Sequence, residues 1–417
     1  MLVHLSITLS YNRTSTSPPA TGSPTIFFKR TRGQVFRRTN FCSPARRRRG
    51  STGQSNHVDF ASENPVDPNN VSYAGCNAPN NVRVKLIGPD GQENITPLYP
   101  CFNHTSLPTL LDAAGVTWRY YANGSGTPHT GIWTAPNAIS PICKPLMGTG
   151  DCNGSDWLND VFFDHKQILR DLGADIQHHP CNLPNVSWVI PNGKWSDHPG
   201  MGDNETDSND IEKGPGWVAS IVNTLGISPC TDLINGHQTS YWNDTVIFIV
   251  WDDWGGWWDH VDPSTAPFLG VLLNIPNCSA WGCGYVHGFR VPFLVVSAYM
   301  ATGNGQQGYV SGDTRTPGGG ELPPYIHDFG SILAFIENNF AFGIGTINPQ
   351  YQFADAYAPE RMANPQAIPL ADFFCISPCT AQPFQRIPVV QGMWQATDFL
   401  NYTGEQTDPD DDAVDDD

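Results

Sequence analysis

The apolar run TVIFIV, residues 245–250, is followed at once by the segment WDDWGGWWDH, residues 251–260. An unbroken run of this kind, ended by polar and glycine residues, is typical of a buried strand in a parallel sheet. Ligands of open α/β sheets collect at the carboxyl ends of such strands. Asp252 and Asp253 therefore mark a candidate ligand site, because they stand where the strand must end.

Other strand-like and helix-like segments alternate along the chain. Four further runs bounded by turn residues predict strands: NVRVKLIGPDG (81–91), GVTWRYYA (115–122), VSWVIP (186–191) and FRVPFLVVSAY (289–299). Four segments with apolar residues at three- and four-residue spacing predict helices: SLPTLLDAAG (106–115), DWLNDVFFDHKQILRDLG (156–173), GPGWVASIVNTLG (214–226) and HDFGSILAFIENNFAFG (327–343). This alternation predicts an α/β fold, an α/β/α sandwich over a mostly parallel central sheet.

The charges divide the chain into two parts. Residues 1–50 contain ten Lys and Arg and no acidic residue, whereas the remainder has 12 basic and 40 acidic residues, a net charge of −28. So acidic a body repels nucleic acid and suits cations. Residues 1–57, rich in Ser, Thr, Pro and Arg, are expected to be a disordered basic segment, with a nucleic-acid-binding arm as the alternative. The folded domain is expected at 58–400, followed by an acidic tail at 401–417.

The cysteines indicate an exported protein. Of 11 cysteines, ten follow residue 70 in local couples: Cys76/Cys101, Cys143/Cys152, Cys181/Cys230, Cys278/Cys283 and Cys375/Cys379. An even set of this kind is typical of disulfides and secretion. Eleven N-x-S/T sequons fit a secreted glycoprotein. The N-terminus lacks a convincing signal peptide, and no transmembrane span is expected.

The adjacent carboxylates Asp252 and Asp253 admit two interpretations. In one, they cap a polar turn at the strand end. In the other, a turn at Gly255-Gly256 lets both approach one hard divalent cation. Neighbouring tryptophans, among them Trp254 and Trp257, would shield the carboxylates from water, and a buried charge without a counter-ion costs several kcal/mol. This favours a metal, although core packing is the commoner role of such tryptophans.

Two Asp-His pairs follow strand-like runs. Asp259-His260 follows the run at 245–250, and Asp197-His198 follows the run at 186–191. A lone histidine is more often structural, and an Asp-turn with an exposed histidine is the alternative for the second pair. Two such pairs beside a metal would suit phosphate ester chemistry, in which imidazolium donors neutralise charge developing on oxygen.

These segments, in this order, resemble the phosphoesterase family that includes bacterial non-haemolytic phospholipases C and related acid phosphatases. The motifs are GVTWRYYA, LPNVSWVIPNGKWSDHPG, GPGWVASIVNTLG, TVIFIVWDDWGGWWDHVDP, GFRVPFLVVSAYM, GYVSGDT and HDFGSILAFIENNF, and they span roughly residues 58–375. The resemblance implies an alkaline-phosphatase-like fold, metal-dependent hydrolysis of phosphate mono- or diesters, and export.

The resemblance also implies roles for particular residues. Asp252 and Asp253 match the family's metal-binding acid pair, and His198 matches the histidine that contacts the phosphoryl group. His260 and His327 match further family histidines. The family's N-terminal strand, its Glu-Asn-Arg motif and its Ser or Thr nucleophile have no counterpart here, so we expect a chain truncated relative to the family at that end, with no assigned nucleophile.

We therefore expect a metal-dependent phosphoesterase, phospholipase C-like or acid phosphatase-like. The expected cofactor is one divalent metal ion of unassigned identity, the substrate a phosphate ester or phospholipid, and no nucleic acid is expected as a partner. The candidate residues are His198 and His260 for catalysis, Asp252 and Asp253 for the metal, and His327, Trp254 and Trp257 for the substrate, the tryptophans through a cation–π wall. Two alternatives are a catalytically impaired relic that binds metal or anions, and a glycan-binding module built on the tryptophans.

Overall fold

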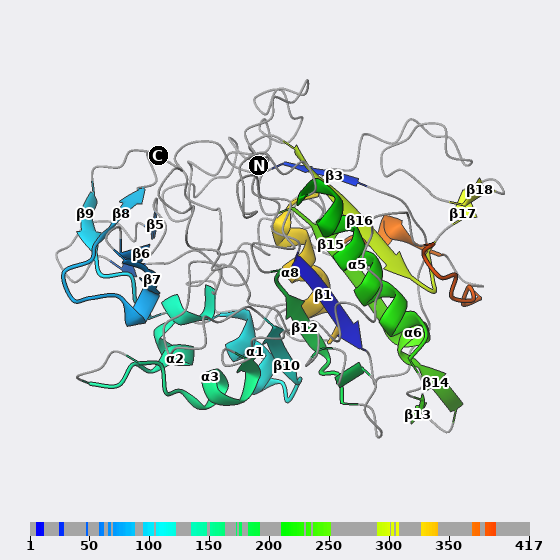
Figure 1. Ribbon diagram of the computed structural model, residues 1–417, viewed down its shortest axis with the longest axis horizontal. Helices are drawn as coiled ribbons and strands as arrows, with labels where there is room; N and C mark the ends of the chain where they lie inside the picture. Colours follow the sequence, from blue (N-terminus) through cyan, green and yellow to red (C-terminus); the bar gives the residue numbers. More distant parts are fainter. Residues whose placement is uncertain are drawn as a thin grey trace.

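The structure is a computed structural model, and Figure 1 shows its helices and strands. The residues that it describes are 6–11, 25–28, 47–48, 58–61, 66–67, 70–87, 95–103, 106–121, 135–147, 151–162, 172, 175–176, 182–191, 210–228, 231–234, 237–251, 290–300, 302–303, 306–307, 327–340, 369–375 and 380–388.

The largest sheet in the described part of the chain has seven strands. Its order is β11-β10-β12-β1-β15-β16-β3. The strands are β1 (Ser6–Tyr11), β3 (Thr25–Phe28), β10 (Trp118–Tyr121), β11 (Val161–Phe162), β12 (Val186–Val189), β15 (Thr245–Val250) and β16 (Arg290–Ser297).

The sheet is mixed. β11, β10 and β12 pair in parallel, whereas β1 is antiparallel to both β12 and β15, and β16 is antiparallel to β15 and β3. The expectation of a mostly parallel sheet is therefore correct only for the β11-β10-β12 side, and elsewhere the ladders are antiparallel. Two of the antiparallel ladders arise because β1, from the N-terminal segment, runs against both of its neighbours, and the other two because β16 runs against β15 and β3.

Helices cover both faces of this sheet (Figure 1). On one face, α5 (Asp210–Gly226) packs Trp217, Ile221 and Leu225 against Ile247 and Ile249 of β15. On the other face, α8 (Phe329–Asn339) and α1 (Leu107–Ala113) join a cluster that contains the alternate residues of the same strands: Trp118, Trp188, Phe248, Val250 and Phe293. This alternation is the two-residue period of a strand buried on both sides. The result is the layered α/β fold that the sequence predicts, while the likeness to alkaline phosphatase stays a prediction.

Smaller elements lie around the main sheet. The remaining strands are β4 (Arg47–Arg48), β5 (Val58–Ala61), β6 (Val66–Asp67), β7 (Asn70–Ala74), β8 (Val84–Ile87), β9 (Ile95–Leu98), β13 (Thr231–Ile234), β14 (His237–Ser240), β17 (Thr302–Gly303) and β18 (Gln306–Gln307). They form one four-stranded sheet, β4-β5-β8-β9, and the pairs β6-β7, β13-β14 and β17-β18. The short helices are η1 (Gly75–Asn77), η2 (Ala135–Ala138), α2 (Ser140–Cys143), α3 (Ser155–Asp160), α6 (Tyr241–Asp244) and η7 (Ala371–Phe373).

Two disulfides connect residues that the sequence couples. Cys76 is bonded to Cys101 and Cys143 to Cys152, across sequence separations of 25 and 9 residues. Cys375 is disulfide-bonded as well. The first two bonds confirm the predicted couples, which close local loops of the kind that disulfides stabilise in oxidising compartments.

Three described strands fall within residues 1–57. They are β1 at the centre of the main sheet, β3 at its edge, and β4 in the four-stranded sheet. The bounds and the disorder predicted for the basic segment as a whole stay predictions. The sequence of β1, SITLSY, alternates polar and apolar residues, and this two-residue period fits a strand.

Residues 380–388, here called the C-terminal strap, lie against α5, α6 and β16. The side-chain amide of Asn223 donates to the Ile387 carbonyl at 3.1 Å and accepts from the Ile387 amide at 2.8 Å. The Trp242 indole donates to the Gln382 carbonyl at 2.8 Å, and the Gln382 amide donates to the Ala298 carbonyl at 2.7 Å. Backbone groups of the strap thus form hydrogen bonds with Asn223, Trp242 and Ala298.

Among the helices of the described residues, none has both the length and the apolar character needed to cross a membrane.

Candidate functional site

Most of the candidate site residues lie outside the described residues: His198, Asp252, Asp253, Trp254, Trp257 and His260. Their roles stay predictions. The two strands that lead to them are described, since β12 ends at Val189 with the chain followed to Pro191, and β15 ends at Val250 with the chain followed to Trp251.

The strands β12 and β15 run in the same direction, because each is antiparallel to β1, which lies between them. Ile7 of β1 pairs with Val189 on one side and with Ile249 on the other, so the two strands end at the same level. The chain therefore leaves the sheet at one edge toward His198 and toward Asp252. This is the edge at which α/β folds bind ligands.

Trp251, the residue before Asp252, is half-buried and packs against the apolar clusters of both sheet faces. A large ring is therefore held at the end of β15, immediately before Asp252 in the sequence. The adjacent carboxylates thus follow an anchored residue.

His327 is the one predicted site residue that the structure describes. Its side chain is fully buried, and its Nε2 lies 3.3 Å from Oδ2 of Asp372 in η7. Its ring lies 5.3 Å from the ring of Phe373, measured between centroids. Asp328, the next residue, accepts a hydrogen bond from the Ser331 amide and caps α8.

His327 belongs to the same end of the sheet as the candidate carboxylates. Phe373 lies 5.6 Å from Phe293 between ring centroids, and Phe293 pairs in register with Val250, two residues before Asp252. A buried histidine bonded to a carboxylate has a fixed ring orientation. Through Phe373 and Phe293, His327 is thus connected to the strand that pairs with the end of β15, and its predicted contact with substrate stays a prediction.

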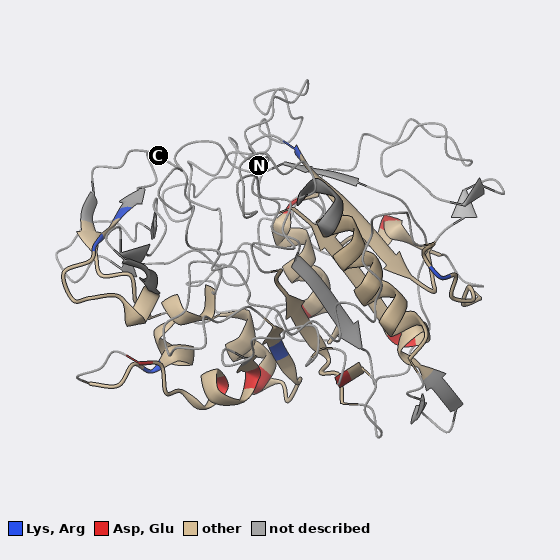
Figure 2. Ribbon diagram, in the orientation of Figure 1, with Lys and Arg blue, Asp and Glu red and all other residues tan. Residues whose placement is uncertain are grey.

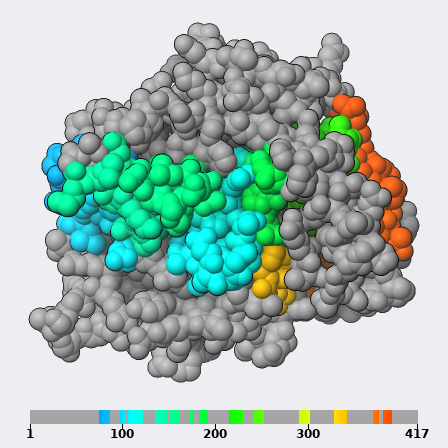
Figure 3. All heavy atoms as spheres, turned by 90° about the horizontal axis from the view of Figure 1, so that it is seen from below, coloured from blue at the N-terminus to red at the C-terminus, as the bar shows by residue number. Residues whose placement is uncertain are grey.

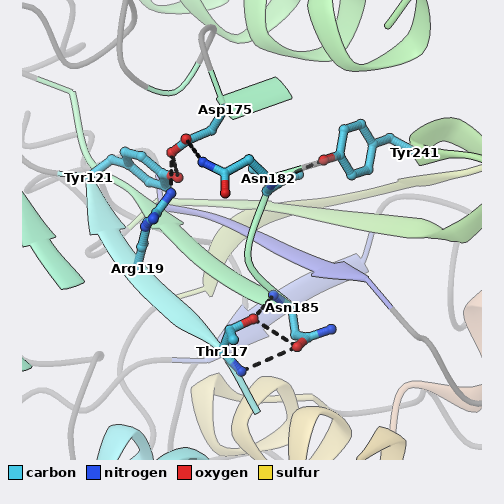
Figure 4. A network of polar contacts seen from close by, with 8 residues as sticks. Thr117, Arg119, Tyr121, Asp175, Asn182, Asn185 and Tyr241 are labelled. Atoms are coloured by element: carbon cyan, nitrogen blue, oxygen red, sulfur yellow. Dashed lines mark hydrogen bonds and ion pairs between the residues drawn. The ribbon is translucent and has the colours of Figure 1, made fainter. Parts of the chain in front are cut away.

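Figure 4 shows a second polar cluster, centred on Asp175. The sequence did not predict this cluster. Oδ2 of Asp175 accepts from the Arg119 guanidinium and the Tyr121 hydroxyl, both at 2.6 Å, and Oδ1 accepts from the Asn182 side chain at 2.6 Å. The Tyr241 hydroxyl accepts from the Leu183 amide at 2.9 Å. These bonds fix the segment before β12 onto β10 and α6.

The protonation of this cluster follows from its burial. Burial and the Asp175 carboxylate raise the pKa of Tyr121 well above its ordinary value, so Tyr121 stays a hydrogen-bond donor. Burial lowers the pKa of Arg119, but Tyr121 and Asp175 outweigh it, and the net change is upward. A sequence signal for this cluster exists, because Arg119 stands between the buried Trp118 and Tyr120 and a charge in such a strand requires a partner.

An acidic group lies on the surface formed by α1 and α3. Figure 2 shows acidic residues on α3, and Figure 3 shows the segments 101–121 and 135–162 adjoining on one face. Burial, followed by the charges of Asp112 and Asp156, raises the pKa of Asp160 to about 6. Among the described residues no three His, Cys, Asp or Glu side chains are grouped as a metal site would require.

The fold and the strand-end geometry define the general class of protein. A sheet covered by helices on both faces is an α/β framework, and folds of this class bind ligands at the ends of their strands. The model of the Phosphoesterase family matches residues 59–343, which is more than half of the chain. The chain therefore belongs to the phosphoesterase family, as the order of its motifs predicts.

Three relatives illustrate the similarity. The non-hemolytic phospholipase C of Pseudomonas aeruginosa is 25% identical over 338 residues, which is 76% of this chain and 41% of the relative. Phospholipase C A of Mycobacterium tuberculosis is 27% identical over 207 residues, 48% of this chain and 35% of the relative. The hemolytic phospholipase C of Pseudomonas aeruginosa is 24% identical over 309 residues, 68% of this chain and 37% of the relative. In each case the match spans less than half of the relative's length.

Proposed function

We propose that this chain hydrolyses phosphate esters, with phospholipids of the phosphocholine type as its substrate class, and that a divalent metal ion bound by Asp252 and Asp253 takes part. The single observation that carries the proposal is the common edge at which β12 and β15 end, because the chain continues from it to His198 and to the paired carboxylates. The family membership and the phospholipase C relatives support the reaction class.

The donor set fits a hard cation. Two adjacent carboxylates after a buried strand offer oxygen ligands of the kind that divalent cations prefer, and they follow the half-buried Trp251 in the sequence. When bound, such an ion polarises the phosphoryl oxygens of an ester. The metal would also offset the cost of two adjacent carboxylates in an apolar surrounding.

The histidines would supply the remaining chemistry. His198 donates a hydrogen bond to a phosphoryl oxygen, and His260 gives a proton to the leaving alkoxide. For His327 the proposed role is contact with the substrate, and its ring is held by Asp372, 3.3 Å away. Trp254 and Trp257 form the wall against which a quaternary ammonium headgroup is held by cation–π attraction. The nucleophile is unassigned.

Secretion belongs to the same proposal. The disulfides Cys76–Cys101 and Cys143–Cys152, with Cys375 also oxidised, require a compartment in which thiols are not kept reduced. A phospholipid substrate would then be met outside the cytosol.

The proposal is tested by turnover. Purified full-length chain, assayed with p-nitrophenyl phosphorylcholine and p-nitrophenyl phosphate in the presence of single divalent ions, should release p-nitrophenol, and chelation should stop the release. Asp252→Asn should lower kcat at least about a hundredfold, because it removes an anionic ligand.

Asp244→Asn is the matched control for this variant. Asp244 precedes β15, at the end of the strand opposite to Asp252, so the same chemical change there should leave the rate within about twofold. A folded chain that hydrolyses neither ester with any divalent ion, or an Asp252→Asn variant as active as the wild type, would refute the proposal.

A further inference from the structure

The segment before residue 59 is not explained by the family. The family match covers residues 59–343, yet β1 and β3, at residues 6–11 and 25–28, belong to the main sheet. β1 occupies an interior position of that sheet, and its residues pair on both sides. A segment outside the family match thus supplies a central strand.

β1 is the connection between two parts of the sheet. β11, β10 and β12 lie on one side, and β15, β16 and β3 on the other, and the order of the strands joins these parts through β1 alone. Neighbouring strands lie about 4.8 Å apart, so β1 holds β12 and β15 roughly 9.5 Å from each other. Without β1, each of these two strands would present an unpaired edge.

Charge favours the same arrangement. The first 50 residues hold ten basic and no acidic residues, and the rest of the chain has a net charge of −28 from 12 basic and 40 acidic residues. Opposite charges on two parts of one chain attract each other and orient their association.

We propose that residues 1–58 are an integral part of the phosphoesterase domain, in which Ser6–Tyr11 is an internal donor strand between β12 and β15. The strand is antiparallel to both neighbours, with Ser10 opposite Val186 and Val246. The basic composition retains the segment on the acidic body. As a consequence that rests on the proposed function, β1 sets the separation between the chain leading to His198 and the chain leading to Asp252.

Cross-linking tests the placement of the strand in the full-length chain. In Ser10→Cys/Val246→Cys, the two new thiols stand opposite each other, and mild oxidation should produce a disulfide-linked peptide that joins residues near 10 and 246 by mass spectrometry. Ser10→Cys/Ile249→Cys, displaced by three residues along β15, should give at most about a tenth of that product, because the thiols no longer face each other. Equal yields in the two variants, or no product from the first in a folded chain, would overturn the proposal.

Hydrogen exchange tests the dependence of the sheet on this strand. Leu9→Pro removes a ladder hydrogen bond in β1, and the amides of residues 186–189 and 245–250 should exchange roughly tenfold faster or more. Ser17→Pro, in a segment that already contains Pro18 and Pro19, should leave that exchange unchanged. Unchanged exchange in Leu9→Pro would overturn the proposal, whereas a Leu9→Pro chain that fails to fold while Ser17→Pro folds supports it.

Neither measurement depends on turnover. A chain that shows the in-register cross-link but hydrolyses no ester leaves the donor strand standing and removes the proposed function. An active chain without the cross-link does the reverse.

Discussion

Two buried hydroxyl groups stand out among the residues of the central sheet. Oγ of Ser187 in β12 and Oγ1 of Thr245 in β15 are buried and have no hydrogen-bond partner among the described residues. Buried polar groups in folded proteins are almost always paired, and an unpaired hydroxyl costs about 1–3 kcal/mol. The unpaired hydroxyl groups of Ser187 and Thr245 therefore destabilise the core.

Thr245→Val should stabilise the protein. Valine keeps the shape and the strand preference of threonine but removes the unpaired hydroxyl, so the free energy of unfolding should rise by about 1 kcal/mol, measured by urea denaturation. Thr224→Val is the matched control, because the Thr224 hydroxyl donates to the Ser220 carbonyl at 2.7 Å and its loss should destabilise. A Thr245→Val chain that unfolds at lower urea than the wild type would contradict this account of the site.

Asp160 should make stability depend on pH. Burial and the charges of Asp112 and Asp156 raise its pKa from 3.8 to about 6, so the folded state holds the proton more tightly than the unfolded state. The favourable contribution of Asp160 is present below pH 3.8 and is lost as the pH rises through about 6. Asp160→Asn cannot ionise, and its melting temperature should exceed that of the wild type at pH 8.

The same variant should show no advantage at a pH below 3.8, where the wild-type carboxyl is protonated in both states. Thermal denaturation at several pH values gives the difference directly. An advantage of equal size at all pH values would show that the substitution acts through packing instead of charge.

At the scale of elements, the C-terminal strap depends on a glycine in α5. A Cβ built on Gly226 would lie 2.2 Å from Cε2 of Phe384, and the Gly226 backbone does not have the positive φ that would by itself require glycine. The Phe384 ring in turn contacts the Trp242 ring, with the centroids 4.9 Å apart. Close approach of the ring to the helix is therefore the reason for glycine here.

Gly226→Ala should destabilise the protein by about 1–3 kcal/mol, because the methyl group displaces the Phe384 ring. In a Phe384→Ala background the same substitution should cost little, which a double-mutant cycle by urea denaturation would measure. Ile227→Ala, at the exposed neighbouring position, serves as the control and should change stability by less than about 0.5 kcal/mol. An equal cost of Gly226→Ala in both backgrounds would contradict the contact.

Most regular elements were predictable because their periodicity is strong. All five predicted strands contain an observed strand, β8, β10, β12, β15 and β16, and three of the four predicted helices are observed as α1, α5 and α8, of which α5 begins four residues before the predicted start. The fourth, predicted at 156–173, is interrupted after Asp160, since Val161 and Phe162 pair with Tyr120 and Tyr121 as β11, and Leu172 is again helical, whereas residues 163–171 lie outside the described residues. Val161 is β-branched and Phe162 is aromatic, and both residue types favour strands. Next to β10 they therefore pair as a strand and do not continue the helix.

Two elements were missed although the sequence contains a signal for each. The residues of β1 alternate over only six positions within a basic, proline-containing segment, and the composition of that segment hid the period. The strands β13 and β14 pair with each other, and Asn235-Gly236 between them in the sequence is the dipeptide preferred in two-residue hairpin turns.

At the scale of the whole molecule, the candidate site follows from topology more than from pairwise contacts. The sequence could predict that strands end before His198 and Asp252, since apolar runs stop there. It could not predict that β1 separates these strands, because strand order depends on long-range pairing that no local period encodes. The Asp175 cluster could not be predicted for the same reason, since Asp175 and Arg119 are 56 residues apart in the sequence.

Metal binding tests the central claim most directly. After removal of bound ions with a chelator, titration calorimetry with Zn²⁺, Mn²⁺ and Ca²⁺ on the folded full-length chain should show a saturable site for at least one ion. The double variant Asp252→Asn/Asp253→Asn should lose that site, while Asp244→Asn, at the opposite end of β15, should retain it. A double variant that binds the ion as tightly as the wild type would contradict a metal centre at this edge of the sheet.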